Sequence, residues 1–137
     1  MDRSPSVALV VDDDPRVRQV VSLYLAQLGL EAISCDDARE VVGLACRYHP
    51  AVIVLDLMLP ITDGFTAIHN LRRHPETATV PIVVISGHPE ALKRARVQIT
   101  DFRATVLLRK PFTVAELRGA VSQARDLAIG DVSESLG

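Results

Sequence analysis

The 137-residue sequence has little of several features that define whole classes of protein. It has only two cysteines, Cys35 and Cys46, which stand eleven positions apart with no second pair. Two cysteines are too few for a disulfide framework, and their spacing does not match a zinc site. We therefore expect two buried thiols in a protein that works in a reducing compartment.

Long apolar runs and a strong net charge are also missing. No stretch approaches the roughly 18 apolar residues of a membrane span, and residues 1–6 are too short and too polar for a signal peptide. The formal net charge of -2 does not predict binding to nucleic acid or to a membrane surface. We expect a soluble, cytoplasmic protein whose functional charges are local.

The composition that remains is that of an ordinary globular protein, with 48% hydrophobic and 23% charged residues. The length suits one domain that buries its own core without disulfides or a structural metal. The sequence shows no internal repeat or low-complexity tract. We expect a single domain over residues 1–129 and a polar C-terminal tail over residues 130–137.

Apolar runs alternate with segments of helical period five times along the chain. This alternation is typical of βαβ units, which build a parallel sheet covered by helices on both faces. We therefore predict a doubly wound α/β fold. The expected strands lie near residues 7–12, 31–35, 51–56, 80–86 and 104–109. The expected helices lie near residues 15–28, 37–48, 64–74, 89–99 and 113–128.

The third apolar run, residues 51–59, contains a single carboxylate, Asp56. An unbroken apolar run suits a central parallel strand buried on both faces, so Asp56 would be exposed only at the carboxyl edge of the sheet. Ligands of open α/β sheets bind at that edge. Taken alone, an Asp after an apolar run is also compatible with a plain surface turn.

Three acids, Asp12, Asp13 and Asp14, follow the first strand directly and precede Pro15. Asp14 before Pro15 is typical of a helix start, with the carboxylate as N-cap. Asp12 and Asp13 are left crowded at the strand end, where a proton or a cation would offset their repulsion. An acidic triplet alone is compatible with a solvated turn, but its place after a buried strand favours a metal site.

Two more polar side chains stand at expected strand ends. Ser86 ends the fourth strand, and Lys110, before Pro111, follows the fifth and brings a positive charge to the same edge. Carboxylates without histidine or thiol suit Mg²⁺, while a lysine and a hydroxyl suit the outer oxygens of a phosphoryl group. The set that we expect to meet, and that indicates phosphoryl transfer, is Asp12, Asp13, Asp56, Ser86 and Lys110.

At these residues the sequence resembles the receiver domains of two-component response regulators, of the single-domain, chemotaxis-regulator type. That family carries an acid pair, an acceptor Asp followed by x-M-x-P-x-x-D-G, a Ser or Thr, and Lys-Pro-Phe. Here these motifs stand at Asp12-Asp13, Asp56 to Gly64, Ser86 and Lys110 to Phe112. The resemblance covers about residues 6–128 and implies a flavodoxin-like, five-stranded parallel sheet in the order 2-1-3-4-5.

The resemblance also implies a role for each acid. Asp56 would take a phosphoryl group from a phosphohistidine of a histidine kinase or a phosphotransfer protein. Asp13, Asp56 and the backbone carbonyl of Met58 would hold Mg²⁺ directly, and Asp12 would act mainly through water.

The remaining roles implied by the resemblance concern the phosphoryl group and the output. Lys110 would pair with the phosphoryl oxygens, and Ser86 would hydrogen-bond them. The output would be a protein contact through the helix near 89–99, the strand near 104–109 and the helix near 113–128. Taken alone, the basic side chains of the helix near 89–99 favour a plain solvated face over a partner surface, and charge alone does not decide between the two.

Two departures from the family pattern concern the fifth strand. Leu107 stands where receivers usually carry Tyr or Phe, so we expect no aromatic rotamer switch there. Residues 102–104 read Phe-Arg-Ala instead of Ala-Gly-Ala, and lack the glycine that would tolerate a positive φ.

Two classes of function are open from the sequence. One is a signalling module that catalyses only its own phosphorylation and dephosphorylation, and that acts through protein contacts or as a phosphate shuttle or sink. The other is an aspartyl-phosphate hydrolase, which uses the same acceptor, lysine and Mg²⁺. Such enzymes need a second Asp two residues after the nucleophile, and here that residue is Met58.

Overall fold

The apolar run that ends in Asp56 forms strand β3 (Val52–Asp56), the middle strand of a five-stranded parallel sheet. The computed structural model describes residues 6–59, 63–99 and 103–136. It pairs β3 with β1 (Ser6–Val11) on one side and with β4 (Ile82–Ser86) on the other. Strands β2 (Leu30–Cys35) and β5 (Thr105–Arg109) are the outermost strands of the sheet. The order β2-β1-β3-β4-β5 confirms the predicted topology.

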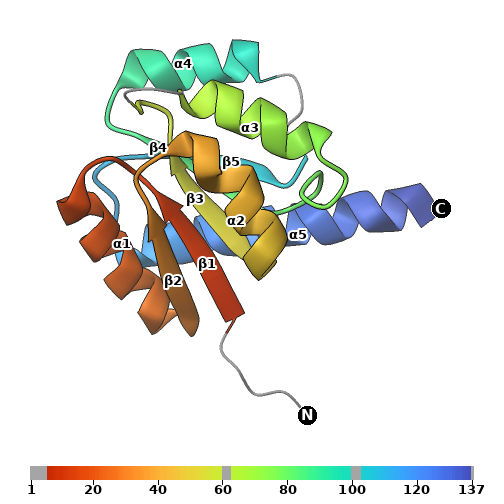
Figure 1. The fold of residues 1–137 in the computed structure, drawn as a ribbon, viewed down its shortest axis with the longest axis horizontal. Helices are drawn as coiled ribbons and strands as arrows, with labels where there is room; N and C mark the ends of the chain where they lie inside the picture. The colour runs from red at the N-terminus through yellow and green to blue at the C-terminus, as the bar shows by residue number, and fades with distance from the viewer. Residues whose placement is uncertain (1–5, 60–62, 100–102, 137) are drawn as a thin grey trace.

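The connections between strands are helical, as predicted (Figure 1). The helices are α1 (Pro15–Gln27), α2 (Val41–Tyr48), α3 (Gly64–Arg73), α4 (Pro89–Gln98) and α5 (Val114–Leu136). The expected helix over residues 37–48 is divided, because its first turn is a short 3-10 helix, η1 (Ala38–Glu40).

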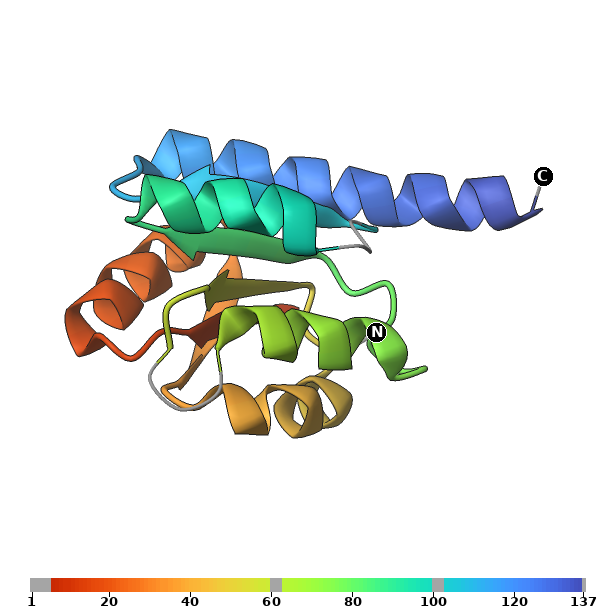
Figure 2. The same cartoon turned by 90° about the horizontal axis from the view of Figure 1, so that it is seen from above.

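The helices cover both faces of the sheet. Buried side chains of α1 and α5 pack on one face, and those of α2, α3 and α4 pack on the other. Figure 2 shows α5 and α2 on opposite sides of the strands. Strand β3 serves both cores, because Val52 and Val54 face α1 and α5 while Ile53 and Leu55 face the opposite layer. A strand buried in this way has no solvent contact except at its ends.

Local sequence signals set the helix starts at the carboxyl edge. Asp14 Oδ1 accepts a hydrogen bond from the Arg16 amide at 2.9 Å, and Pro15 is the first residue of α1. At α5, the Thr113 amide donates to Glu116 Oε1 at 3.0 Å and the Glu116 amide donates to Thr113 Oγ1 at 3.1 Å. These caps fix how each helix leaves the strand before it.

Helix α5 runs on to Leu136, past its expected end near residue 128 (Figure 1). The residues expected to form a polar tail from Gly130 therefore continue a helix. A glycine costs a helix only about 1 kcal/mol and no proline follows it, so the sequence has no strong stop signal there. Residue 137 lies outside the described part, and the domain boundary at residue 129 stays a prediction.

Among the described residues, no helix combines the length and the apolar character needed to cross a membrane.

Candidate functional site

The carboxyl ends of four strands bring the predicted residues to one edge of the sheet. Asp12 and Asp13 follow β1, Asp56 ends β3, Ser86 ends β4 and Lys110 follows β5. The three carboxylates have oxygens that lie within 4.8 Å of one another. The site therefore assembles from residues that are up to 98 positions apart in the chain.

Lys110 joins the two buried acids. Its Nζ donates to Asp12 Oδ2 at 2.9 Å and to Asp56 Oδ2 at 3.1 Å, and its amide donates to the carbonyl of Ser86 at 2.9 Å. Burial opposes the charged ammonium, but the hydrogen bond to Asp12 and the charge of Asp56 outweigh it, so the pKa of Lys110 is raised. The lysine is thus a fixed positive charge, and its peptide bond to Pro111 is cis.

Asp12 and Asp13 are adjacent but lie in different environments. Asp12 is 0% exposed, and its Oδ1 accepts a hydrogen bond from the Asp14 amide at 2.9 Å. Burial raises the pKa of Asp12, although the hydrogen bonds from Asp14 and Lys110 oppose that shift. Asp13 is exposed, and within the described residues its carboxylate has no hydrogen-bonding partner. Asp13 is therefore the acid most open to a new ligand.

Asp56 is oriented by donors on two sides. The residue is 5% exposed, its Oδ1 accepts a hydrogen bond from the Met58 amide at 3.0 Å, and its Oδ2 faces Lys110. The start of α3 packs directly on this strand end, because a Cβ at Gly64 would lie 2.6 Å from the carbonyl oxygen of Asp56 and from Leu57 Cα. Only glycine fits at this position. Residues 60–62 of the predicted loop lie outside the described residues.

Ser86 completes the edge from β4. It is fully buried, and its Oγ accepts a hydrogen bond from the His88 amide at 3.1 Å. Because a hydroxyl accepts and donates at once, this arrangement leaves the O–H proton of Ser86 for an anion. The next residue, Gly87, lies beside Lys110, where an added Cβ would stand at an ordinary contact distance of 3.9 Å from Lys110 Cβ.

One residue that the sequence patterns did not single out also reaches the site. Arg18, half-buried on the first turn of α1, donates from Nη1 to the backbone carbonyl of Asp12 at 2.6 Å. An arginine on a helix usually indicates solvated surface, so composition and periodicity carry no signal for this contact. The only available signal is its spacing, one turn after the N-cap Asp14.

Two hollows adjoin the acid cluster. The larger, about 570 Å³, lies beside Lys110 and is lined mainly by apolar side chains of α1 and of the segment after β5. Its α1 wall includes Val20, which is 44% exposed. The second hollow, about 390 Å³, lies beside Asp13 and Met58 and extends to Arg94 on α4. Both give the acid edge room for a partner molecule.

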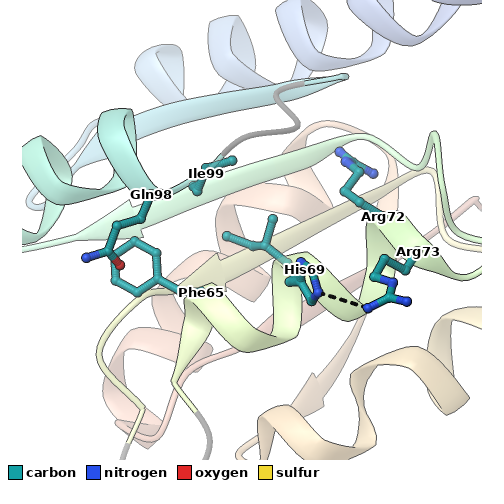
Figure 3. A pocket seen from close by; sticks show the side chains of 7 residues that line it. Phe65, His69, Arg72, Arg73, Gln98 and Ile99 are labelled. Atoms are coloured by element: carbon teal, nitrogen blue, oxygen red, sulfur yellow. Dashed lines mark hydrogen bonds between the residues drawn. The ribbon is translucent and has the colours of Figure 1, made fainter.

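A third cavity, of about 210 Å³, lies between α3 and α4, and no carboxylate is among the residues that line it (Figure 3). Arg73 Nη1 meets His69 Nε2 there at 3.4 Å. Arg72 points away from this pair, and its guanidinium donates to Val80 O and to Thr105 Oγ1, both at 2.8 Å. The Arg72 side chain thus ties α3 to the starts of β4 and β5, at the edge of the sheet opposite the acids.

The two departures from the family pattern have structural counterparts. Leu107 is half-buried and packs against the core cluster beneath α2, α3 and α4. The chain adopts a positive φ before β5 even without glycine, because Ala104 has φ +49°. The carbonyl of Ala104 accepts from the Ile82 amide at 2.8 Å, which anchors this conformation. Phe102 lies outside the described residues.

The donor set at the edge fits a hard divalent cation. Three carboxylates supply only oxygen ligands, and one of them is exposed and free to coordinate. Mg²⁺ is the usual ion for such a set beside a phosphoryl group, because it keeps several waters and needs few protein ligands.

Residues 8–122 match the family model described as the response regulator receiver domain. The chain is 35% identical over 113 residues to the DNA-binding dual master transcriptional regulator RpaA of Synechocystis, a match that covers 82% of this chain and 46% of RpaA. It is 34% identical over 122 residues to the C4-dicarboxylate transport transcriptional regulatory protein DctD of Pseudomonas aeruginosa, covering 87% of this chain and 25% of DctD. The chain thus spans less than half the length of either relative.

Solved structures show the same fold. The receiver domain of a sensor histidine kinase from Pseudomonas aeruginosa PAO1, which has a magnesium ion coordinated in its active site cleft, aligns with a TM-score of 0.78 at 27% identity, covering 90% of this chain and 99% of that one. The chemotaxis protein CheY4 of Vibrio cholerae aligns with a TM-score of 0.75 at 26% identity, covering 88% and 99%. The fold, the edge geometry and the family match agree, and the chain belongs to the response regulator receiver domain family of two-component systems.

Proposed function

We propose that Asp56 accepts a phosphoryl group from a phosphohistidine of a sensor histidine kinase or a phosphotransfer protein. The observation that carries this proposal is the setting of Asp56 at the end of the central strand. It is oriented by Met58 and Lys110 and stands beside two further carboxylates. Asp12 also accepts hydrogen bonds from a backbone amide and from Lys110, but it follows β1, whereas Asp56 ends the central strand.

The chemistry is an in-line transfer between two nucleophiles. A carboxylate oxygen of Asp56 forms an O–P bond while the P–N bond of the donor breaks, and the electron pair of that bond stays with the donor imidazole. Such a transition state needs positioning and charge neutralisation more than covalent help. Lys110, already 3.1 Å from Asp56 Oδ2, neutralises charge on the phosphoryl oxygens. Ser86 donates its free O–H proton to another of them.

Asp13, Asp56 and the backbone carbonyl of Met58 would hold Mg²⁺, and Asp12 would act mainly through water. When bound, Mg²⁺ screens the carboxylates from the incoming phosphoryl oxygens. The exposed, unpartnered Asp13 and the anchored, buried Asp12 support this division of roles. The magnesium in the cleft of the Pseudomonas relative supports the choice of ion.

The donor would dock over the hollow beside Lys110. Its α1 wall carries apolar side chains such as Val20, which is 44% exposed, and Leu23 on the same helix is 59% exposed. A partner that covers this wall brings its phosphohistidine to the mouth of the acid cluster. The charges of the acid cluster and the apolar contacts of the α1 wall would then both contribute to binding of the donor.

The phosphorylated domain would act in the cytoplasm through protein contacts, or as a phosphate shuttle or sink. The output surface would comprise α4, β5 and α5, where Val97 is 79% exposed beside the basic side chains of α4. In this role the chain catalyses only its own phosphorylation and dephosphorylation.

Labelling with acetyl phosphate and Mg²⁺, followed by mass spectrometry, tests the acceptor. Wild type should gain one phosphoryl group, and Asp56→Asn should gain none. Asp14→Asn is the matched control, because it removes a nearby negative charge but keeps an N-cap side chain, and it should label normally. Stoichiometric labelling of Asp56→Asn at another residue would refute the assignment.

The alternative function, an aspartyl-phosphate hydrolase, predicts turnover rather than a single labelling event. Met58 supplies a backbone amide to Asp56 and has no acidic side chain to protonate a leaving group. Incubation with phosphate monoesters separates the two functions, because sustained release of phosphate belongs only to the hydrolase.

A further inference from the structure

Arg18 reaches back from α1 to the loop that carries the acid pair. Its Nη1 donates to the carbonyl oxygen of Asp12 at 2.6 Å. Side chains on a helix lean toward its N-terminus, so an arginine on the first turn naturally covers the end of the preceding strand. The carbonyl that it binds belongs to the peptide group that joins Asp12 to Asp13. Arg18 therefore holds the backbone from which Asp13 projects.

All the hydrogen-bonding atoms of Asp12 are engaged. Its amide donates to the carbonyl of Cys35 at 3.2 Å, its Oδ1 accepts from the Asp14 amide, and its Oδ2 accepts from Lys110. Arg18 binds the remaining carbonyl oxygen, and the residue is completely buried. The contact from Arg18 is the one that fixes the plane of the peptide leading to Asp13.

Asp13 has no anchor of its own. Its side chain is exposed, and its carboxylate has no hydrogen-bonding partner within the described residues. One of its oxygens nevertheless lies within 4.8 Å of oxygens of Asp12 and Asp56. The direction of this carboxylate is therefore set by its backbone, and that backbone is held by Arg18.

We propose that Arg18 is a positioning residue for Mg²⁺ binding, which fixes the Asp12–Asp13 peptide and so aims the Asp13 carboxylate at the ion. The identity of the ion rests on the function proposed above. Arg18 acts through Asp13 and touches neither the ion nor the phosphoryl group. Groups that orient a metal ligand in this way typically contribute about 10- to 100-fold to metal affinity.

The charge of Arg18 and its geometric role predict opposite results when it is removed. A positive charge near a cation site weakens cation binding, so loss of the charge alone would strengthen Mg²⁺ binding. Loss of positioning would weaken it, because Asp13 would no longer be held toward the ion. The direction of the change in the dissociation constant therefore separates the two roles.

The test compares Arg18→Met and Arg18→Lys with a matched control, Arg16→Met. Arg16 is exposed on the same turn of α1, and within the described residues its guanidinium makes no hydrogen bond. Isothermal titration calorimetry at fixed ionic strength gives the Mg²⁺ dissociation constant. Acetyl phosphate labelling gives the Mg²⁺ concentration for half-maximal rate, and melting in EDTA gives the stability without metal.

We expect Arg18→Met to raise the dissociation constant and the half-maximal Mg²⁺ concentration about tenfold. The labelling rate at saturating Mg²⁺ should recover to within about twofold, because the ion restores the ligand geometry. Arg18→Lys should raise both constants by a smaller factor, and since it keeps the charge, any weakening reports geometry alone. Arg16→Met should leave both constants within about twofold of wild type.

A dissociation constant for Arg18→Met at or below that of wild type would overturn the proposal. A loss confined to the melting temperature in EDTA would overturn it too, because it would make the contact purely structural. If Arg18→Met does not fold, the test rests on Arg18→Lys. An unchanged Mg²⁺ dissociation constant in Arg18→Lys would then contradict the positioning role of Arg18. Wild type that binds Mg²⁺ but is never labelled would contradict the proposed function while leaving this comparison valid.

Discussion

Buried charge is neutralised differently at the carboxyl edge of the sheet, where the strands end, and at the amino edge, where they begin. At the carboxyl edge, three carboxylates lie close together beside one ammonium. Lys110 contacts Asp12 and Asp56, and within the described residues Asp13 has no such contact. At the amino edge, the single guanidinium of Arg72, which is 5% exposed, is surrounded by acceptors. Those acceptors are the carbonyls of Thr77, Ala78, Val80 and Ala104 and the hydroxyl of Thr105.

This difference separates a binding edge from a structural edge. The acid cluster keeps more negative charge than Lys110 neutralises, and a bound cation or a proton would offset the remainder. The repulsion between the carboxylates lowers the stability of the fold but favours binding of a cation. The guanidinium of Arg72 is held by the fixed dipoles of backbone carbonyls and of the Thr105 hydroxyl, which makes it a structural contact. Substitution of Arg72 should therefore change stability, and substitution of the acid side chains at the carboxyl edge should mainly change ion binding.

The largest expected effect is at the amino edge. Arg72→Met should lower the free energy of unfolding by about 3 kcal/mol, because it strips buried carbonyls of a charged donor. Arg73→Met, the same change at an exposed neighbour with one 3.4 Å contact to His69, should cost no more than about 0.5 kcal/mol. Urea unfolding in EDTA measures both. Equal losses in the two variants would mean that the buried contacts of Arg72 add no more stability than the single contact of an exposed arginine.

The second largest effect is expected at Gly64, where the start of α3 packs against the backbone at the carboxyl edge. Gly64→Ala should destabilise the fold by about 2 kcal/mol, because the new Cβ must displace the backbone of Asp56 and Leu57. Labelling at Asp56 should slow as well. Gly119→Ala on α5 has open space around it and should stabilise by about 0.5 kcal/mol. Thermal melts of the two variants moving in the same direction would contradict this account.

A smaller change in stability is expected at the exposed acid. Asp13→Asn should leave the free energy of unfolding in EDTA within about 0.5 kcal/mol of wild type, at or above it, because it removes repulsion and no hydrogen bond. The rise in melting temperature on adding Mg²⁺ should largely vanish. A clear loss of stability in EDTA would mean that Asp13 belongs to the structural scaffold.

The smallest expected effect is a pH dependence. Burial raises the pKa of Asp12 above its ordinary value of 3.8, so the folded protein holds this proton more tightly than the unfolded chain does. The resulting stability is present below the ordinary pKa and is lost as pH rises through the folded-state pKa. In EDTA, the stability of wild type minus that of Asp12→Asn should therefore fall with rising pH. An increase would mean that pairing with Lys110 outweighs burial.

Most of the helices and strands, and the meeting of these side chains at one edge of the sheet, followed from local patterns. Asp12, Asp56, Ser86 and Lys110 each stand at the end of an apolar run, and parallel strands place their carboxyl ends on one edge. The departures were at element ends. Residues 38–40 form a 3-10 turn, and α5 passes Gly130 because one glycine is a weak stop signal.

The roles of Arg18 and Arg72 were not predictable in the same way. Both stand on amphipathic helices where an arginine indicates solvated surface, and most of their partners are backbone carbonyls. Every residue carries a carbonyl, so no sequence pattern marks the ones that a guanidinium will reach.

By itself the sequence determined the alternation of strands and helices, the two helix layers and the set of side chains at the carboxyl edge, because hydrophobic periodicity and strand ends are local properties. The strand order followed from the resemblance to receiver domains, not from these local patterns. Only the tertiary structure decided that Asp12 is buried and anchored while its neighbour Asp13 is exposed and free. The two residues have the same side chain, and their difference comes from Cys35, Lys110 and Arg18, which belong to other elements. Contacts between distant segments, not the residue type, set which of two adjacent carboxylates is free to bind.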